Sequence, residues 1–149
     1  MKRFALGFCL LPLLTINFAA TARQGNKSRD ESVAVRATVT DYVEGYYAGD
    51  AARMEKSLHP HYLKHMISAS DGAVRMTEKT GLQMVQDVRS GGPADLPKSE
   101  RTEQITVLDV SEDMASAKLV TPHWIDYMTL TKWNGEWKIV SVAQRIADN

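Results

Sequence analysis

HWIDYMTLTKWNGEWKIVSVAQ, residues 123–144, contains two runs of β-branched and aromatic residues that are separated by Asn134 and Gly135. An Asn-Gly pair supplies the two positive-φ positions that a type I′ turn requires. Because each run is long enough for a strand, the stretch predicts two antiparallel strands joined by a tight turn. The rest of the chain has to cover this hairpin.

Side chains along a strand point alternately to its two faces, so the first run of the hairpin divides into two rows. One row contains Trp124, Asp126, Met128 and Leu130, and the other contains Ile125, Tyr127, Thr129 and Thr131. The first row is apolar except for the carboxyl group of Asp126. This row is where the sequence suggests a chemical site.

Helical patterns come before the strands in the chain. Val35, Val39, Tyr42, Val43, Tyr46 and Tyr47 form the apolar stripe of one amphipathic helix. Ser32 is expected to cap this helix and Gly49 to end it, and Asp50 is expected to cap a second helix over residues 51–58. A third helix is expected after Thr77, with Leu82, Val85 and Val88 at three-residue spacing.

Strands are expected at residues 61–69, 73–76, 104–110 and 114–122, in addition to the hairpin. Helices followed by a run of strands predict an α+β fold, with an antiparallel sheet and the helices gathered on one side of it. At 149 residues the chain has room for one such domain, which we assign to residues 32–147.

Two positive charges, an apolar run from Phe4 to Ile16 and the A-x-A sequence at 20–22 predict a signal peptide over residues 1–22. Cleavage near Ala22 would export the protein to the periplasm or the medium. Residues 23–31 are polar and are expected to form a disordered leader.

Removal of residues 1–22 leaves 16 basic and 18 acidic residues, so the net charge is −2. This balance gives no indication of the excess positive charge that binds nucleic acid or an anionic membrane. Removal also takes away Cys9, the single cysteine, and with it any disulfide or thiol chemistry.

Four strings in this order resemble the putative lumazine-binding proteins, a branch of the superfamily named after nuclear transport factor 2. They are YVEGYYAGDAARMEKSLHP, GLQMVQDV, VLDVSEDMASAKL and WIDYMTLTKWNGEWKIVSV, and the resemblance extends from Val33 to about Ile146. It implies a cone, in which a curved antiparallel sheet wraps around a long N-terminal helix and two shorter helices. A pocket is implied between the sheet and the helices.

Proteins of this superfamily include ketosteroid isomerases, scytalone dehydratase, polyketide cyclases of the SnoaL kind and binding domains without catalysis. The resemblance therefore implies a pocket but does not choose a reaction, because fold does not fix function.

Asp126 is the first candidate site residue. In a concave apolar row its carboxyl group would project into the pocket, where burial raises a carboxyl pKa and suits the group to proton transfer. It is a candidate catalytic acid or base, a ligand contact, or a bracing residue that pairs with an arginine or a helix tyrosine.

Tyrosines and histidines supply the other candidates. Tyr42 and Tyr46 lie one turn apart on the helix stripe, where a hydroxyl could reach a ligand or serve only in packing. His65 is expected at the pocket. His123 could reach the pocket mouth, or could belong to a strand edge or a bulge after Pro122. Together with the Asp126 row, the expected pocket residues are Tyr42, Tyr46, His65, His123, Trp124, Asp126, Met128 and Leu130.

No metal site is expected, because His61 and His65 are about 13 Å apart on a strand and no carboxylate or cysteine completes a ligand set. His59 is expected at a helix end, and Trp133 and Trp137 are expected to be structural.

Sequence motifs for hydrolases, nucleotide-binding loops and zinc proteases are absent. Any catalysis would therefore be acid–base work without a cofactor. Three functions stay open: binding of a small apolar or aromatic molecule, a cofactor-free isomerase, dehydratase or cyclase, and a protein-interaction module that dimerises through the face with Ile125, Tyr127 and Thr129.

Overall fold

The structure is a computed structural model that describes residues 16–70 and 72–146. Most of the predicted signal peptide, residues 1–15, lies outside the described residues. The part that is described, from Ile16 onward, belongs to a helix. Within the described residues no helix is both long enough and apolar enough to cross a membrane.

Helices and strands follow one another in the predicted order. The helices are α1 (Ile16–Ala48), α2 (Ala51–Ser57) and α3 (Gly81–Arg89), with a short 3-10 helix, η1 (Lys98–Glu100). The strands are β1 (Leu58–Ser70), β2 (Ala73–Thr80), β3 (Gln104–Ser111), β4 (Met114–Val120), β5 (Trp124–Trp133) and β6 (Glu136–Ile146).

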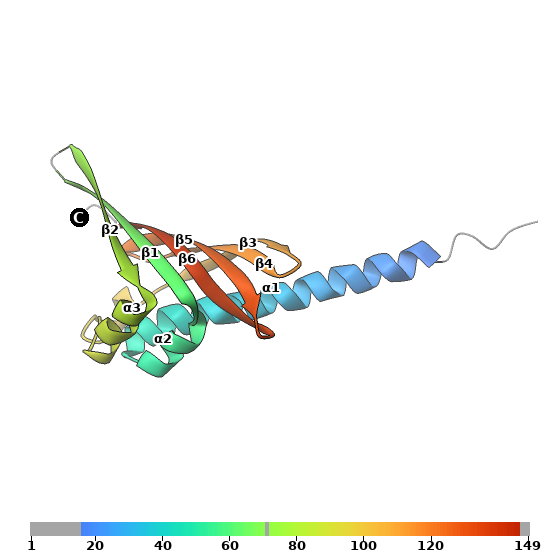
Figure 1. The fold of residues 1–149 in the computed structure, drawn as a ribbon, viewed down its shortest axis with the longest axis horizontal. Helices are drawn as coiled ribbons and strands as arrows, with labels where there is room; N and C mark the ends of the chain where they lie inside the picture. The colour runs from blue at the N-terminus through green and yellow to red at the C-terminus, as the bar shows by residue number, and fades with distance from the viewer. Residues whose placement is uncertain (1–15, 71, 147–149) are drawn as a thin grey trace, which may run out of the picture.

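The six strands form one curved, open sheet with the order β2-β1-β6-β5-β4-β3. All three helices lie on the same side of this sheet, with α1 running along it and α2 and α3 gathered at one end (Figure 1). The predicted α+β fold is confirmed. Four of the five strand pairs are antiparallel as expected, but β1 and β6 run parallel, so the sheet is mixed and the prediction of a wholly antiparallel sheet is wrong. The two strands are far apart in the sequence, so no hairpin turn requires them to be antiparallel.

The hairpin of β5 and β6 has the predicted geometry. Asn134 and Gly135 have φ values of 52° and 85°, as a type I′ turn requires, and Trp133 pairs with Glu136 across the turn. Asp126, Met128 and Leu130 are buried on the inner face of β5, whereas Tyr127 and Thr129 are exposed on the outer face. The alternation read from the sequence is therefore confirmed.

A β-bulge in β6 sets which residues of that strand face inward. Leu130 pairs with Ile139, but Thr129 pairs with Ser141, so Val140 is the extra residue. The bulge keeps Trp137 and Ile139 on the same face as Val142 and Gln144, although the spacing between positions 139 and 142 breaks the period of two. Gln144 therefore lies opposite Asp126.

Two helix starts differ from the prediction. Helix α3 is capped by Thr80 and not by Thr77, because Thr80 and Gln83 form a complete capping box while Thr77 continues β2. Helix α1 continues through Ser32 and through residues 23–31, which were expected to be a disordered leader. The Ser32 hydroxyl donates to the Ser28 carbonyl, an ordinary i−4 contact inside a helix, so Ser32 is not a cap.

The end of α1 and the cap of α2 are as predicted, but the end of α2 is not. Gly49 has a φ of 69° and ends α1, and the Asp50 carboxylate accepts from the backbone N–H of Arg53 at 3.0 Å to cap α2. Helix α2 ends at Ser57, and His59 with Pro60 opens β1 and does not close the helix.

The core lies between α1 and the inner face of the sheet. The predicted stripe of α1 supplies Val35, Val39, Tyr42, Val43 and Tyr47, and the sheet supplies Ala117, Leu119, Met128, Leu130, Trp137, Ile139 and Val142. In α3 the buried residues are Met84, Val85 and Val88, while Leu82, which was expected on the stripe, is 67% exposed. Leu82 is the second residue of α3, in the first turn of the helix, and its side chain faces solvent.

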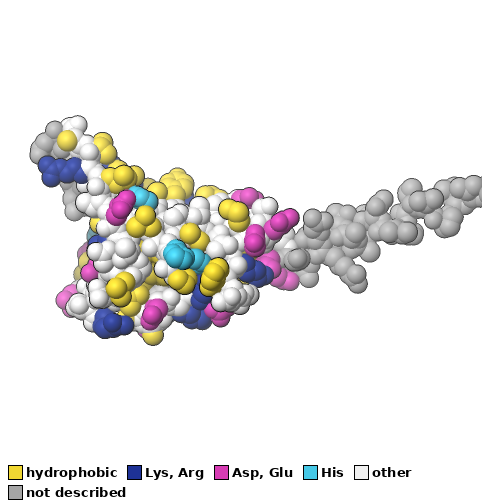
Figure 2. Space-filling view, in the orientation of Figure 1, with side chains coloured by type: hydrophobic (Ala, Val, Ile, Leu, Met, Phe, Trp, Pro, Cys, Tyr) yellow, Lys and Arg dark blue, Asp and Glu magenta, His cyan; other side chains and the backbone are white. Residues whose placement is uncertain are grey.

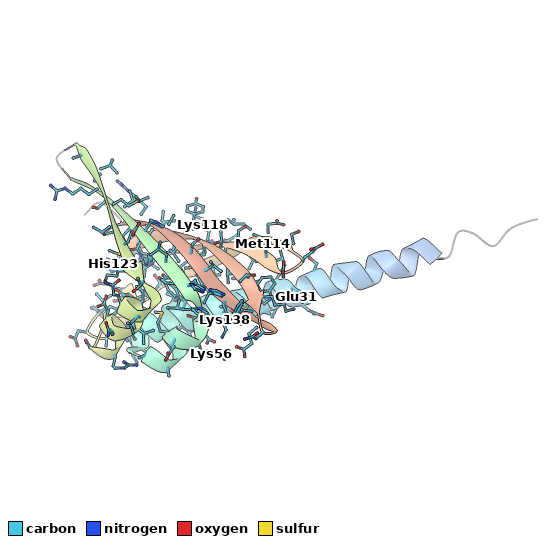
Figure 3. All side chains as sticks on the ribbon, viewed as in Figure 1. Glu31, Lys56, Met114, Lys118, His123 and Lys138 are labelled. Atoms are coloured by element: carbon cyan, nitrogen blue, oxygen red, sulfur yellow. The ribbon has the colours of Figure 1, made fainter. Side chains whose placement is uncertain are left out.

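Glu31 joins α1 to the hairpin. Its carboxylate forms an ion pair with Lys132 and accepts from the indole N–H of Trp137 at 2.8 Å. Figure 3 shows Glu31 at the point where α1 leaves the cover of the sheet. This contact fixes the position of the helix along the strands that it packs against.

Candidate functional site

A cavity of about 260 Å³ opens between α1, α3 and the inner face of the sheet. We call it the sheet–helix cavity. Its walls come from α1, β1, β2, α3, the loop after α3, the start of β5 and the end of β6. The lining residues are Tyr42, Val43, Tyr46, Lys64, Met66, Lys79, Met84, Asp87, Gly92, His123, Trp124, Gln144 and Ile146.

The local sequence explains how two of these walls form. Tyr42 and Tyr46 lie one helical turn apart, so both face the sheet from α1. On β1, Tyr62, Lys64 and Met66 alternate with outward residues and share the inner face. Lys64 is thereby placed in the apolar interior, directly opposite the α1 stripe.

Four side chains form a buried polar cluster, which we call the Lys64 cluster. The Lys64 ammonium donates to the Tyr42 hydroxyl at 2.9 Å and lies 3.7 Å from Oδ2 of Asp126. The hydroxyl oxygens of Tyr42 and Tyr62 are 3.5 Å apart. The side chains of Lys64 and Asp126 are 5% and 0% exposed, so both charges are removed from water.

Asp126 occupies a different place from the expected one. It lies behind the cavity wall, which is formed there by Lys64, Trp124 and Gln144. Neither carboxylate oxygen has a hydrogen bond of normal geometry within the described residues. The carboxyl group therefore acts on the cavity only through Lys64 and the other neighbours that cover it.

Burial shifts the pKa values of the cluster in the direction that disfavours charge. It raises the pKa of Asp126, while the nearby Lys64 and the side chains of Gln144 and Trp124 oppose that rise. It lowers the pKa of Lys64, which the Asp126 charge opposes. Burial also raises the pKa of Tyr42 well above its ordinary value, so this hydroxyl stays protonated.

Charged pairs also lie at the edge of the cavity. Lys79 of β2 forms an ion pair with Asp87 of α3, which joins two walls of the cavity. His123 lies beside α3 and β2 (Figure 3), and its Nε2 is 3.3 Å from a carboxylate oxygen of Glu100. The ring planes of Trp124 and Tyr46 are at 90° to each other in a T-shaped contact, with 5.5 Å between the ring centroids. The rim is thus polar and the interior is aromatic.

Apart from Asp126, the predicted pocket residues separate into three groups. Tyr42, Tyr46, His123 and Trp124 line the cavity, as expected. Met128 and Leu130 belong to the packed core and do not reach it. His65 points to the opposite face of β1, where its Nε2 is 3.2 Å from Glu78, because odd positions of this strand face away from α1.

Several lining residues were not predicted. Lys64 and Met66 share a face with Tyr62, which the period of two in β1 could have indicated. Gln144 is on the inner face only because of the bulge at Val140. Lys79, Met84 and Asp87 come from β2 and α3, and their approach to Lys64 depends on the tertiary fold.

Histidines and acidic residues do not form a metal site in the described part of the chain, where no group of three His, Cys, Asp or Glu side chains could hold an ion. The His59 ring is buried against Trp133, with 4.7 Å between centroids, and its Nδ1 accepts from the backbone N–H of His61. Burial lowers the pKa of His59. Its role is structural.

The outer face of the sheet carries exposed apolar side chains, among them Leu108, Met114 and Tyr127. In Figure 2 the hydrophobic side chains on the face in view form several separate patches between polar ones. Lys118 lies over the Tyr127 ring, 5.3 Å from its centroid.

Comparisons with known proteins agree with this architecture. The model of the family described as "Putative lumazine-binding" matches residues 30–143. No curated protein matches the chain.

Solved structures with the same fold include two nuclear transport factor 2-like proteins of unknown function. That from Silicibacter pomeroyi has a TM-score of 0.60 and 18% identity over 80% of this chain and 98% of its own. That from Shewanella baltica has a TM-score of 0.62 and 17% identity over 80% of this chain and 96% of its own.

A ketosteroid isomerase-like protein from Erwinia carotovora atroseptica has a TM-score of 0.55 and 11% identity over 80% of this chain and 98% of its own. At these identities the structures establish the fold alone. The family match covers most of the sequence, so the chain belongs to the putative lumazine-binding family, and its sheet and helices have the same fold as the nuclear transport factor 2-like structures.

Proposed function

We propose that this chain binds a small, largely apolar or aromatic molecule in the sheet–helix cavity. The observation that carries the proposal is the cavity itself, which combines an apolar lining from Met66, Met84 and Trp124 with a few convergent polar groups. Small-molecule sites generally have this composition. A volume of about 260 Å³ suits a ligand of one or two rings.

The charges around the cavity favour a neutral ligand. Lys64 is compensated by Asp126, and Lys79 is compensated by Asp87, so the walls bring no unbalanced charge to the interior. An ionic ligand would lose its hydration without gaining an opposite charge in return. A flat neutral molecule can instead pack against Trp124 and Tyr46 and accept a hydrogen bond at its polar edge.

A thermal-shift screen with a matched pair of variants tests the proposal. The probes are lumazine, which the family description suggests, together with flavins, steroids and aromatic polyketides. A ligand at about 100 times its dissociation constant adds about 2.7 kcal/mol to the free energy of unfolding, which raises Tm measurably.

Met66→Trp fills the cavity and is expected to abolish the rise in Tm. Met76→Trp makes the same change on β2, where Met76 is 62% exposed, and is expected to retain the rise. A ligand that stabilises both variants equally would place the binding site elsewhere and contradict the proposal. Absence of any shift across the panel would favour the interaction module.

A cofactor-free isomerase, dehydratase or cyclase is a second candidate, favoured by the Lys64 cluster. Its groups could hold or move a proton at the wall of the cavity, with Tyr42 as hydrogen-bond donor to a developing oxyanion. Asp126 would act through Lys64. Given a substrate, unchanged turnover in Asp126→Asn would remove Asp126 from this role.

We also propose that the protein is exported after cleavage near Ala22 and forms a homodimer through the outer sheet face. The charged and apolar segments of residues 1–22 support export, and exposed Leu108, Met114 and Tyr127 support an interface. Mass spectrometry of the cell-free fraction should find a chain that begins at Arg23. A sedimentation measurement that shows a monomer at micromolar concentration would contradict the dimer.

A further inference from the structure

We infer that Lys64 is a nucleophilic amine that condenses with the carbonyl group of a small aromatic aldehyde or ketone held in the sheet–helix cavity. The inference rests on the proposed binding function, because the carbonyl compound has to enter the same cavity. It assigns a covalent chemistry, imine formation, to one residue of the wall.

Access and burial single out this amine. Among the lysines whose side chains the structure describes, Lys64 alone is buried, and it lines the cavity. A carbonyl carbon in the cavity can therefore approach Nζ without passing through bulk water. A lysine that is desolvated in an apolar pocket is the usual form of an imine-forming amine.

The contact between Lys64 and Asp126 lacks the close hydrogen bonds of a salt bridge that serves only to stabilise the fold. The 3.7 Å separation exceeds a hydrogen bond, and both carboxylate oxygens lack a normal hydrogen bond among the described residues. A buried ion pair stabilises a fold only when its geometry is close and its remaining polar atoms are satisfied. The Tyr42 hydroxyl, which also lines the cavity, is therefore the close hydrogen-bond partner of the amine.

Protonation of the amine is also disfavoured by its surroundings. Burial lowers the pKa of Lys64, and the positive charge of Lys79 lowers it further, while Asp126 opposes both effects. A lower pKa increases the fraction of neutral amine, which is the form that attacks a carbonyl carbon. Burial raises the pKa of Asp126, so this carboxylate can accept the proton that the ammonium gives up.

Imine formation balances with the groups present. The lone pair of neutral Nζ adds to the carbonyl carbon, and the π electrons of the C=O bond move to oxygen, which takes a proton. Loss of a proton from nitrogen gives the neutral carbinolamine. The C–O bond then breaks, the hydroxyl leaves as water with a proton, and a C=N bond forms. The net change is one carbonyl and one amine to one imine and one water.

The residues around Nζ can move the protons that these steps require. Asp126, 3.7 Å from Nζ, is placed to take the ammonium proton, which frees the nitrogen lone pair for attack on the carbonyl carbon. The proton that leaves with the hydroxyl is the one that nitrogen loses as the C=N bond forms. The Tyr42 hydroxyl, 2.9 Å from Nζ, orients the amine. Because burial keeps Tyr42 protonated, its hydroxyl can also donate to the oxygen of the carbinolamine.

Reductive trapping of the intact protein tests the inference. The full chain is incubated with 2-naphthaldehyde and cyanoborohydride, and the modified lysines are located by peptide mass mapping. We expect one naphthylmethyl group per chain, on Lys64, introduced at least about tenfold faster than on any exposed lysine, because binding in the cavity holds the aldehyde beside Nζ.

Lys64→Arg keeps a buried cation and cannot form an imine, so it is expected to lose the label. Lys118→Arg, on the outer face, is the matched control and is expected to retain it. If Lys64→Arg does not fold, the site of the label in the wild-type peptide map decides alone.

A binding probe separates this inference from the proposed function. 2-Methylnaphthalene has the same ring system and no carbonyl, so it reports on the cavity without the chemistry. A rise in Tm with 2-methylnaphthalene but label only on exposed lysines would overturn the imine while the binding function stands. No rise in Tm and no label on Lys64 would overturn both.

Discussion

Replacement of Lys64 by methionine is expected to lower the free energy of unfolding by about 3 kcal/mol near neutral pH. Methionine fills nearly the same volume, so little of this loss comes from packing. The loss arises because Asp126, 0% exposed, keeps its burial and loses the cation that compensates its charge. Urea denaturation of the variant and the wild type measures the difference.

The loss should depend on pH with a definite sign. Burial raises the pKa of Asp126, and removal of Lys64 takes away the largest opposing effect, so the folded-state pKa rises further in the variant. The folded state then holds a proton that the unfolded state releases above about pH 4. Stability of Lys64→Met relative to the wild type therefore falls as the pH rises from about 4 toward 7, and the deficit is smallest below that window.

A double variant gives the control. Lys64→Met combined with Asp126→Leu removes both charges and is expected to regain most of the loss, because apolar side chains of similar volume replace a buried pair with little cost. A single variant with wild-type stability at about pH 7, or with a deficit that grows below about pH 4, would contradict the described burial of the pair.

Trp137→Ala is expected to cost about 4 kcal/mol of unfolding free energy. Trp137 is 4% exposed in the core, and its indole N–H donates to Glu31 at 2.8 Å, so truncation leaves a void and a partly buried carboxylate without that donor. Thermal or urea unfolding gives the measurement.

Trp133→Ala is the matched control, on the same hairpin and directly before Asn134 of the turn. Trp133 is 45% exposed and contacts the His59 ring, so its removal is expected to cost about 1 kcal/mol. Equal losses in the two variants would show that the inner and outer faces of β6 and β5 have been assigned wrongly.

Local sequence signals were sufficient for most elements. The Asn134-Gly135 pair, the period of two along β5 and the stripe of α1 depend on neighbouring residues, and each is found as predicted. The N-cap of α3 could have been predicted correctly from the sequence, but it was assigned to Thr77, three residues before Thr80. Thr80 and Gln83 have the spacing of a capping box, which Thr77 lacks.

Gln144 shows why the site was harder to predict than the fold. Counting from the turn with a strict period of two pairs Asp126 with Ala143 and turns Gln144 outward. The bulge at Val140 shifts the register by one residue and brings Gln144 inside. In the sequence the bulge is visible only as a three-residue spacing between the apolar residues Ile139 and Val142. This spacing does not show which of the residues between them is unpaired.

Lys64 has the place at the cavity wall that the sequence suggests for Asp126. A carboxyl group in an apolar row of a strand predicts a group in the pocket, but the curvature of the sheet puts Asp126 behind the wall and Lys64 on it. Which of two inward residues meets a cavity depends on the depth of each strand in the sheet. Lys64 is on β1 and Asp126 is on β5, and β6 lies between these two strands in the sheet, so their relative positions depend on pairing between segments that are distant in sequence.

The most direct test of the central claim is a crystal structure of the protein with the compound that raises Tm most. The account predicts electron density for the compound in the sheet–helix cavity, in contact with Trp124, Met84 and Lys64. Density in the groove beside Leu58, Leu82 and Val85, with the sheet–helix cavity free of the compound, would contradict it.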